Sequence, residues 1–144
     1  MPASRLTLGE SSIKYYVLSI MDSTKIKSFT DLEAWKEAHK LVIRIYEATK
    51  SFPDDERFGL TNQIRRAVVS ITSNVAEGFS RNGNKEKTQF YYMALGSLTE
   101  AQNQLLVARD LTYVSEKEFT EIANQTVVVS KLLNGLIKSA KNMQ

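Results

Sequence analysis

Apolar side chains recur at steps of three and four residues along most of the chain. This period places them on one face of an α-helix and predicts amphipathic helices. Four such stretches run from about 30 to 51, from 60 to between 78 and 83, from 85 to 111, and from 116 to about 142. Alternating runs bounded by hairpin turns do not occur, so strands are not expected. Short links between long helices favour an all-α fold, an antiparallel up-down four-helix bundle.

Polar residues mark where two of the helices begin. Thr30-Asp31-Leu32-Glu33 has the pattern of a capping box, in which the Thr30 hydroxyl accepts a hydrogen bond from the backbone N–H of Glu33. Ser115-Glu116-Lys117-Glu118 repeats this pattern before the fourth helix. Pro53 ends the first helix, because the residue before a proline disfavours the helical conformation.

The chain has 144 residues, of which 42% are hydrophobic, enough for one domain with its own core. We expect residues 29–142 to form the bundle and residues 1–28 to form an N-terminal tail, with Met21 as a candidate translation start. The longest apolar run, Tyr15–Met21, is far shorter than the roughly 18 residues that span a bilayer. We therefore expect no membrane segment, no targeting signal and a cytoplasmic location.

Cysteine and histidine are too scarce for most catalytic and metal sites. The chain has no cysteine, which excludes disulfides, thiolate nucleophiles and cysteine-bound metals. The single histidine, His39, has Lys36 three residues before it, so the Glu-x-x-His motif of di-iron bundles is absent. Glu77 and Glu100 can face each other across the second and third helices, but two carboxylates make a poor metal cage. We expect no catalytic residue, metal or cofactor, and we interpret His39 as a packed, hydrogen-bonded imidazole at the edge of the apolar stripe rather than a general base or proton switch.

Basic residues gather in two places. Arg65 and Arg66 lie off the apolar face of the second helix, and Arg81, Lys85 and Lys87 lie near the link to the third. The net charge of +3 allows an anionic partner without requiring one. These residues either contact phosphates or form a solvated face with intramolecular ion pairs, which is the commoner case in one small chain. A symmetric oligomer would favour the first alternative, because it repeats a modest patch around a ring.

Aromatic residues and glycines also have two interpretations each. Phe90-Tyr91-Tyr92 can stack on bases, but packing is the more frequent use, with the last of the three facing outward. Gly78 and Gly83 lack the spacing of a phosphate-binding loop, which favours a helix end and a turn. Gly96, inside the third helix, marks either a close contact between helices or subunits, or a tolerated glycine.

The most distinctive stretch is Gly59–Gly78, which reads GLTNQIRRAVVSITSNVAEG. It resembles the signature of the four helix bundle protein family, also called the ribosomal RNA intervening-sequence protein family. Ala94–Glu100 resembles the second block of that family, and Phe29–Lys36 resembles its usual start. The resemblance covers about residues 29–142. Thr72 stands where a proline is often found, so any kink that the proline causes is not expected here.

Polar residues of the matched stretch recur at three- and four-residue steps, which places them on one stripe of the second helix. The stripe comprises Gln63, Arg66, Ser70, Ser73, Asn74 and Glu77. It suits either a hydrogen-bonded interface between subunits or a surface that faces RNA. We assign to this signature or interface the residues Gln63, Ser70, Asn74, Glu77, Gly78, Gly96 and Glu100.

The resemblance implies a homopentamer without a catalytic reaction. Some members of the family are encoded inside intervening sequences of ribosomal RNA genes. A related accessory protein of diversity-generating retroelements binds a reverse transcriptase and nucleic acid. We therefore expect a non-enzymatic oligomer that binds RNA, or a nucleic-acid-processing protein, through Arg65, Arg66, Arg81, Lys85 and Lys87. The alternatives are a protein-interaction scaffold without nucleic-acid contact and, third, an enzyme that uses the polar stripe.

Overall fold

The computed structural model describes residue 13 and residues 26–143. The expected tail lies almost wholly outside these residues, as does Met21. The described chain is helical throughout its regular elements, which are η2 (Phe29–Asp31), α2 (Glu33–Thr49), η3 (Asp54–Glu56), α3 (Leu60–Ser80), α4 (Asn84–Asp110) and α5 (Glu116–Asn142). The predicted all-α fold with four helices is confirmed. The predicted limits agree to within two residues except at the start of α2.

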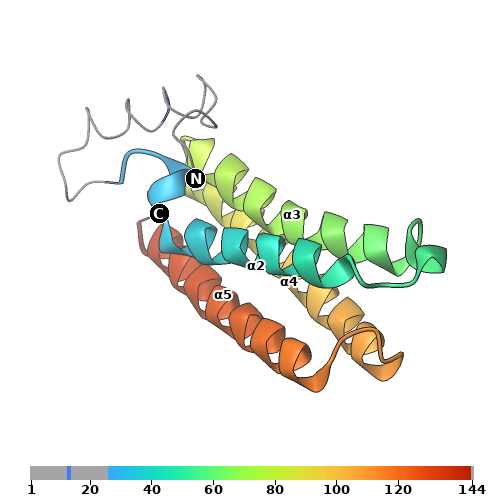
Figure 1. Ribbon diagram of the computed structural model, residues 1–144. Coiled ribbons are helices and arrows are strands. Elements are labelled where there is room, and N and C mark those ends of the chain that lie inside the picture. The colour runs from blue at the N-terminus through green and yellow to red at the C-terminus, as the bar shows by residue number, and fades with distance from the viewer. Residues whose placement is uncertain (1–12, 14–25, 144) are drawn as a thin grey trace.

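Each helix lies beside the next in sequence, and α5 returns beside α2 (Figure 1). Contacts between α3 and α4 give their relative direction. Gly78 faces Tyr91, whereas Ser70, further from the link, is hydrogen-bonded to Ser97. The two residues of a contacting pair lie further apart in sequence as the pair lies further from the link, which requires α3 and α4 to be antiparallel. The start of α2, the end of α3, the start of α4 and the end of α5 therefore meet at one end of the bundle (Figure 1).

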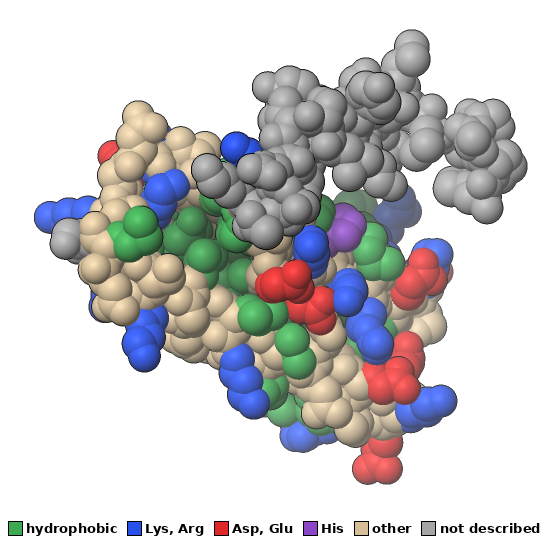
Figure 2. All heavy atoms as spheres, turned by 90° about the vertical axis from the view of Figure 1, so that its left-hand side faces the viewer, with side chains coloured by type: hydrophobic (Ala, Val, Ile, Leu, Met, Phe, Trp, Pro, Cys, Tyr) green, Lys and Arg blue, Asp and Glu red, His purple; other side chains and the backbone are tan. Residues whose placement is uncertain are grey.

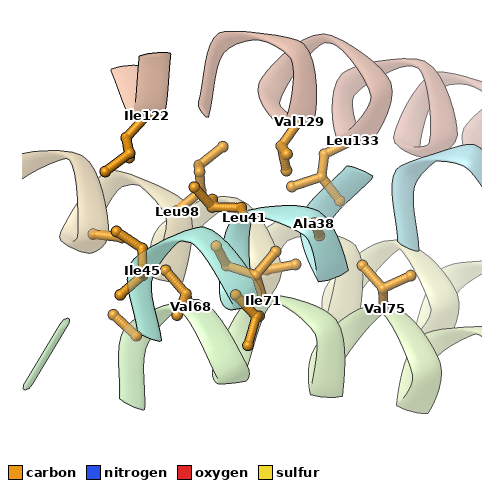
Figure 3. Close-up of a cluster of buried hydrophobic side chains, with 14 of the residues drawn as sticks. Ala38, Leu41, Ile45, Val68, Ile71, Val75, Leu98, Ile122, Val129 and Leu133 are labelled. Carbon is orange, nitrogen blue, oxygen red and sulfur yellow. The ribbon is translucent and has the colours of Figure 1, made fainter. Parts of the chain in front are cut away.

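All four helices contribute to one core of aliphatic side chains (Figure 3). Its largest fully buried members are Leu41, Ile64, Val68, Ile71, Val75, Leu98, Val129 and Leu133. These residues occupy the apolar stripes that the sequence period predicts. Burial of each such side chain contributes about 1.5–3 kcal/mol, so the stripes dominate the stability of the fold.

The start of α2 differs from the predicted capping box. Ser28 caps the short helix η2 instead, and its backbone N–H donates to the Asp31 carboxylate at 3.0 Å. The Thr30 hydroxyl donates to Ser28 Oγ at 3.0 Å, and α2 begins at Glu33 without a side-chain cap. The prediction at Thr30 was wrong because the chain turns at Leu32, whose extended backbone buries its side chain against the core.

Gly78 is not part of a turn but lies inside α3, where α4 approaches closely. A Cβ atom at this position would lie 2.7 Å from Tyr91 Cε1 and 2.9 Å from Phe90 Cβ. Gly96 lies on the exposed side of α4, and a Cβ atom there would meet no described atom within 4 Å. The close contact between helices within one subunit is therefore at Gly78 and not at Gly96, because only Gly78 faces the neighbouring helix.

Candidate functional site

The five predicted nucleic-acid-binding residues lie in two separate groups on α3 and α4. Arg65 and Arg66 lie in the first half of α3, and Arg81 follows its last residue. The fifteen residues from Arg66 to Arg81 correspond to about 22 Å along a helix. Figure 2 shows one side of the molecule, on which Lys and Arg side chains are scattered and acidic side chains lie among them. The group at Arg65 and Arg66 and the group at the α3–α4 link therefore do not form one continuous basic patch.

The group at the α3–α4 link is largely engaged in holding that link. Arg81 forms an ion pair with Glu77 at 3.7 Å, and its guanidinium lies 4.8 Å from the ring centre of Phe90. Lys87 Nζ donates to the backbone carbonyl of Phe79 at 2.6 Å, near the end of α3. Burial lowers the pKa of Lys87. Lys85 is exposed, and its side chain has no hydrogen bond, ion pair or ring contact within the described residues.

Arg65 is fixed against α2 by two contacts. Its Nε atom donates to Thr49 Oγ1 at 2.8 Å, and its guanidinium lies 4.6 Å from the ring centre of Tyr46. The Thr49 hydroxyl donates in turn to the carbonyl of Ile45 at 2.7 Å, so the acceptor is itself held in place. No carboxylate pairs with Arg65 among the described residues. Its charge is positioned by neutral partners and is not neutralised.

Arg66, the next residue, has none of these partners. It is exposed, and of the arginines within residues 26–143 it alone has no ion pair, hydrogen bond or ring contact through its side chain. An arginine without an internal partner is available to a ligand, and its planar fork of donors matches phosphate and carboxylate geometry.

Both arginines line a shallow depression between α2 and α3, which we call the α2–α3 depression. It has a volume of about 400 Å³ and is lined by Tyr46, Arg65, Arg66, Val69, Ser70 and Ser73. Two depressions between α2 and α5 include carboxylates, Glu37 in one and Glu47, Glu118 and Glu121 in the other. The α2–α3 depression includes two guanidinium groups and no carboxylate. It is therefore suited to an anionic ligand.

The polar stripe of α3 is divided between two uses. Ser70 Oγ is hydrogen-bonded to Ser97 Oγ at 2.8 Å, and Asn74 Nδ2 donates to the Ser70 carbonyl at 2.9 Å and to Ser70 Oγ at 3.1 Å. The first of these contacts joins α3 to α4, and the other two lie within α3 and hold the Ser70 hydroxyl in place. Gln63 and Ser73 remain exposed. Part of the signature thus holds two helices together, and part faces outward.

Glu77 and Glu100 do not face each other across α3 and α4, so the pair that the sequence allows is not formed. The pairing of Ser70 with Ser97 places Glu100 opposite the first half of α3, far from Glu77 near its end. Glu77 pairs with Arg81, and Glu100 accepts a hydrogen bond from Gln104 at 3.1 Å. Within the described residues, no three histidine or carboxylate side chains gather closely enough to hold a metal ion.

His39 stacks on a neighbouring ring, but it is exposed and has no hydrogen bond within the described residues, so the predicted packed, hydrogen-bonded imidazole is only partly found. Its ring lies flat on Trp35, with ring centres 4.7 Å apart and an angle of 13° between the planes. Among the described residues, no helix is both long and apolar enough to cross a membrane.

Sequence reasoning did not single out two residues that matter at these surfaces. Tyr46 lies at a position that the helical period assigns to the apolar stripe of α2, yet it is 39% exposed and forms one wall of the α2–α3 depression. Gln104 is buried, and its Oε1 atom has no hydrogen-bond partner. Both properties depend on neighbouring helices, so no local pattern around either residue indicates them.

Comparison with models of protein families shows to which family the chain belongs. The model of the 23S rRNA-intervening sequence protein family matches residues 30–135, from the start of α2 into α5. The chain belongs to this family. The match includes both blocks of the signature and the whole α2–α3 depression. No curated protein matches the sequence.

Among solved structures, the family fold is found in a protein of unknown function from the S23 ribosomal protein family of Bacteroides thetaiotaomicron. The two structures align with a TM-score of 0.68 and 22% sequence identity, over 73% of this chain and 95% of that chain. At this identity the likeness establishes the shared fold. The family is of unknown function, so any function must be argued from the surface of this chain.

Proposed function

We propose that this protein is a non-enzymatic, homo-oligomeric four-helix bundle that binds RNA through the α2–α3 depression. The observation that carries the proposal is the pair of adjacent arginines in a depression without a carboxylate. Phosphate groups of nucleic acids are bound by arginine and lysine, and this contribution supplies much of the affinity.

The two arginines are suited to different parts of this task. Arg65 is held by Thr49 and Tyr46, so little side-chain entropy is lost when its terminal nitrogens bind a phosphate. Arg66 has no partner to give up on binding. By contrast, Arg81 and Lys87 would have to leave Glu77 and the end of α3. We therefore place the main RNA contact at Arg65 and Arg66, with Lys85 as a secondary contact.

The proposal is tested with a fluorescein-labelled stem-loop RNA and measurement of fluorescence anisotropy over a salt series. We expect Arg66→Ala to weaken binding and to lower the slope of log K against log salt by about 0.7–0.9, the effect of one phosphate contact. The matched control is Arg44→Ala, which removes the same charge from an arginine paired with Glu121 at 3.6 Å. Equal effects of the two substitutions, or no binding at low salt, would contradict the proposal.

Self-association is proposed through the outer side of α4. Met93, Val107 and Leu111 are 55%, 39% and 48% exposed and share one side of this helix with Gly96. Contact with a second copy would cover these apolar side chains. We expect five subunits because the sequence resembles that of the four helix bundle protein family.

The competing function is a protein-interaction scaffold that does not bind nucleic acid. The same apolar side of α4 supports it, because exposed apolar patches mark protein interaction sites. The two functions differ in the RNA experiment. A scaffold shows no salt-dependent RNA binding, and Arg66→Ala leaves its association with a protein partner unchanged.

A further inference from the structure

Tyr46 brings an aromatic ring to the α2–α3 depression, which also includes Arg65 and Arg66. The ring is 39% exposed, and the Arg65 guanidinium lies over it at 4.6 Å. The Tyr46 hydroxyl has no hydrogen bond within residues 26–143. The exposed part of this residue is therefore free to contact a ligand, next to two cationic groups.

We infer that the α2–α3 depression binds single-stranded RNA, with one unpaired base stacked on the Tyr46 ring and adjacent phosphates bound by Arg65 and Arg66. This inference rests on the proposed function and specifies its ligand. Aromatic rings beside a cationic groove are the usual platform for single strands, because every base has a face that can stack. In a duplex the bases are stacked on one another, and side chains reach mainly the phosphates and the 2′-hydroxyls.

The side chains packed around Tyr46 prepare its ring to stack on a base. Arg65 is anchored through Nε to Thr49 and its guanidinium packs over the Tyr46 ring, while its terminal nitrogens make no hydrogen bond within the described residues. A ring held in place loses less conformational entropy when a base stacks on it. Val69 adds an apolar side chain to the same depression, which suits a base better than a phosphate.

Other exposed aromatic rings lack this combination. Phe58 is 86% exposed and the Arg57 guanidinium lies 5.5 Å from its ring centre, but it follows the acidic helix η3, whose three carboxylates repel a phosphate chain. Tyr92 is 46% exposed, and Lys141 Nζ lies 5.0 Å from its ring centre, but no arginine lies beside it among the described contacts. Tyr46 is therefore the ring that we assign to base stacking.

The test compares two labelled RNAs, an oligouridylate of about twelve nucleotides and a duplex of the same length. We expect the protein to prefer the single strand. Tyr46→Ala should weaken single-strand binding about tenfold to a hundredfold, the effect of one stacked base, and change duplex binding less than about twofold. Tyr46→Phe keeps the ring and should bind as the parent does. Ile43→Ala is the control, since Ile43 is 52% exposed on the same helix and lies outside the depression.

Further measurements separate stacking from damage to the fold. Thermal unfolding by circular dichroism checks each variant, and Tyr46→Leu keeps the apolar bulk without an aromatic face, so it should lose single-strand affinity as Tyr46→Ala does. Equal losses for both RNAs would overturn the stacking inference and leave the phosphate contact of Arg65 and Arg66 in place. Absence of binding to either RNA at low salt would instead overturn the proposed function together with this inference.

Discussion

At the scale of single residues, Gly78 decides how closely two helices approach. A Cβ atom there would lie 2.7 Å from the ring of Tyr91, which is only 2% exposed and has little room to move. The second obstacle is Phe90 Cβ at 2.9 Å, which is tied to the backbone of α4. The absence of a side chain at Gly78 is therefore a requirement of the α3–α4 contact.

We predict that Gly78→Ala lowers the free energy of unfolding by about 1–2 kcal/mol. Overpacking costs about 1–3 kcal/mol, and the better helix propensity of alanine returns part of it. The control is Gly135→Ala in α5, where a Cβ atom meets no described atom within 4 Å. Gly135→Ala should raise the free energy of unfolding by up to about 1 kcal/mol. Urea unfolding at one fixed protein concentration measures both, and stabilisation by Gly78→Ala would show that the helices separate easily.

At the scale of secondary-structure elements, similar sequence patterns produce different helix starts. Ser115 accepts a hydrogen bond from the backbone N–H of Glu118 at 3.1 Å, as predicted for the start of α5. Thr30 has the same pattern but serves a different turn, because Asp31 accepts hydrogen bonds from the backbone N–H groups of Lys27 and Ser28. A tight turn before α2 thus replaces the predicted cap.

We predict that Ser115→Ala lowers the free energy of unfolding by about 1 kcal/mol, the usual effect of losing an N-cap. Thr30→Ala should lower the free energy of unfolding clearly less, because the Thr30 hydroxyl donates to Ser28 Oγ and does not cap a backbone N–H of α2. Chemical unfolding of both variants makes the comparison. A loss at Thr30 as large as that at Ser115 would mean that Thr30 caps α2 in solution.

At the scale of the whole molecule, the bundle presents two outer surfaces with different chemistry. The α2–α3 depression is cationic and contains Tyr46. The outer side of α4 exposes Met93, Val107 and Leu111. A ring of subunits that uses the apolar surface for assembly would repeat the cationic depression around its axis and strengthen RNA binding through several weak contacts.

We predict that the purified protein is an oligomer, with a light-scattering mass near five subunits, and that Val107→Asp shifts it towards the monomer. A charge on an apolar interface must be desolvated without a partner, which weakens association. Val127→Asp is the matched control, since Val127 is 47% exposed on α5, away from this side of α4. A monomeric parent protein, or equal effects of the two substitutions, would exclude the α4 surface as the interface.

Local sequence patterns determined the number of helices, their buried faces and the cap at Ser115. These properties depend on residues within a few positions of one another, so the helical period and the capping pattern suffice to predict them. The inward positions of Ile71 and Leu98 follow directly from that period.

Only the tertiary structure decided which polar residues meet. The pairing of Arg65 with Thr49 and Tyr46, and the distance between Arg66 and the link at Arg81, depend on how α2, α3 and α4 are placed side by side. The same register separates Glu77 from Glu100, which no spacing along one helix could indicate. Contacts between helices depend on their offset and closeness, and these are set by side chains such as Gly78 that act only once the helices have packed.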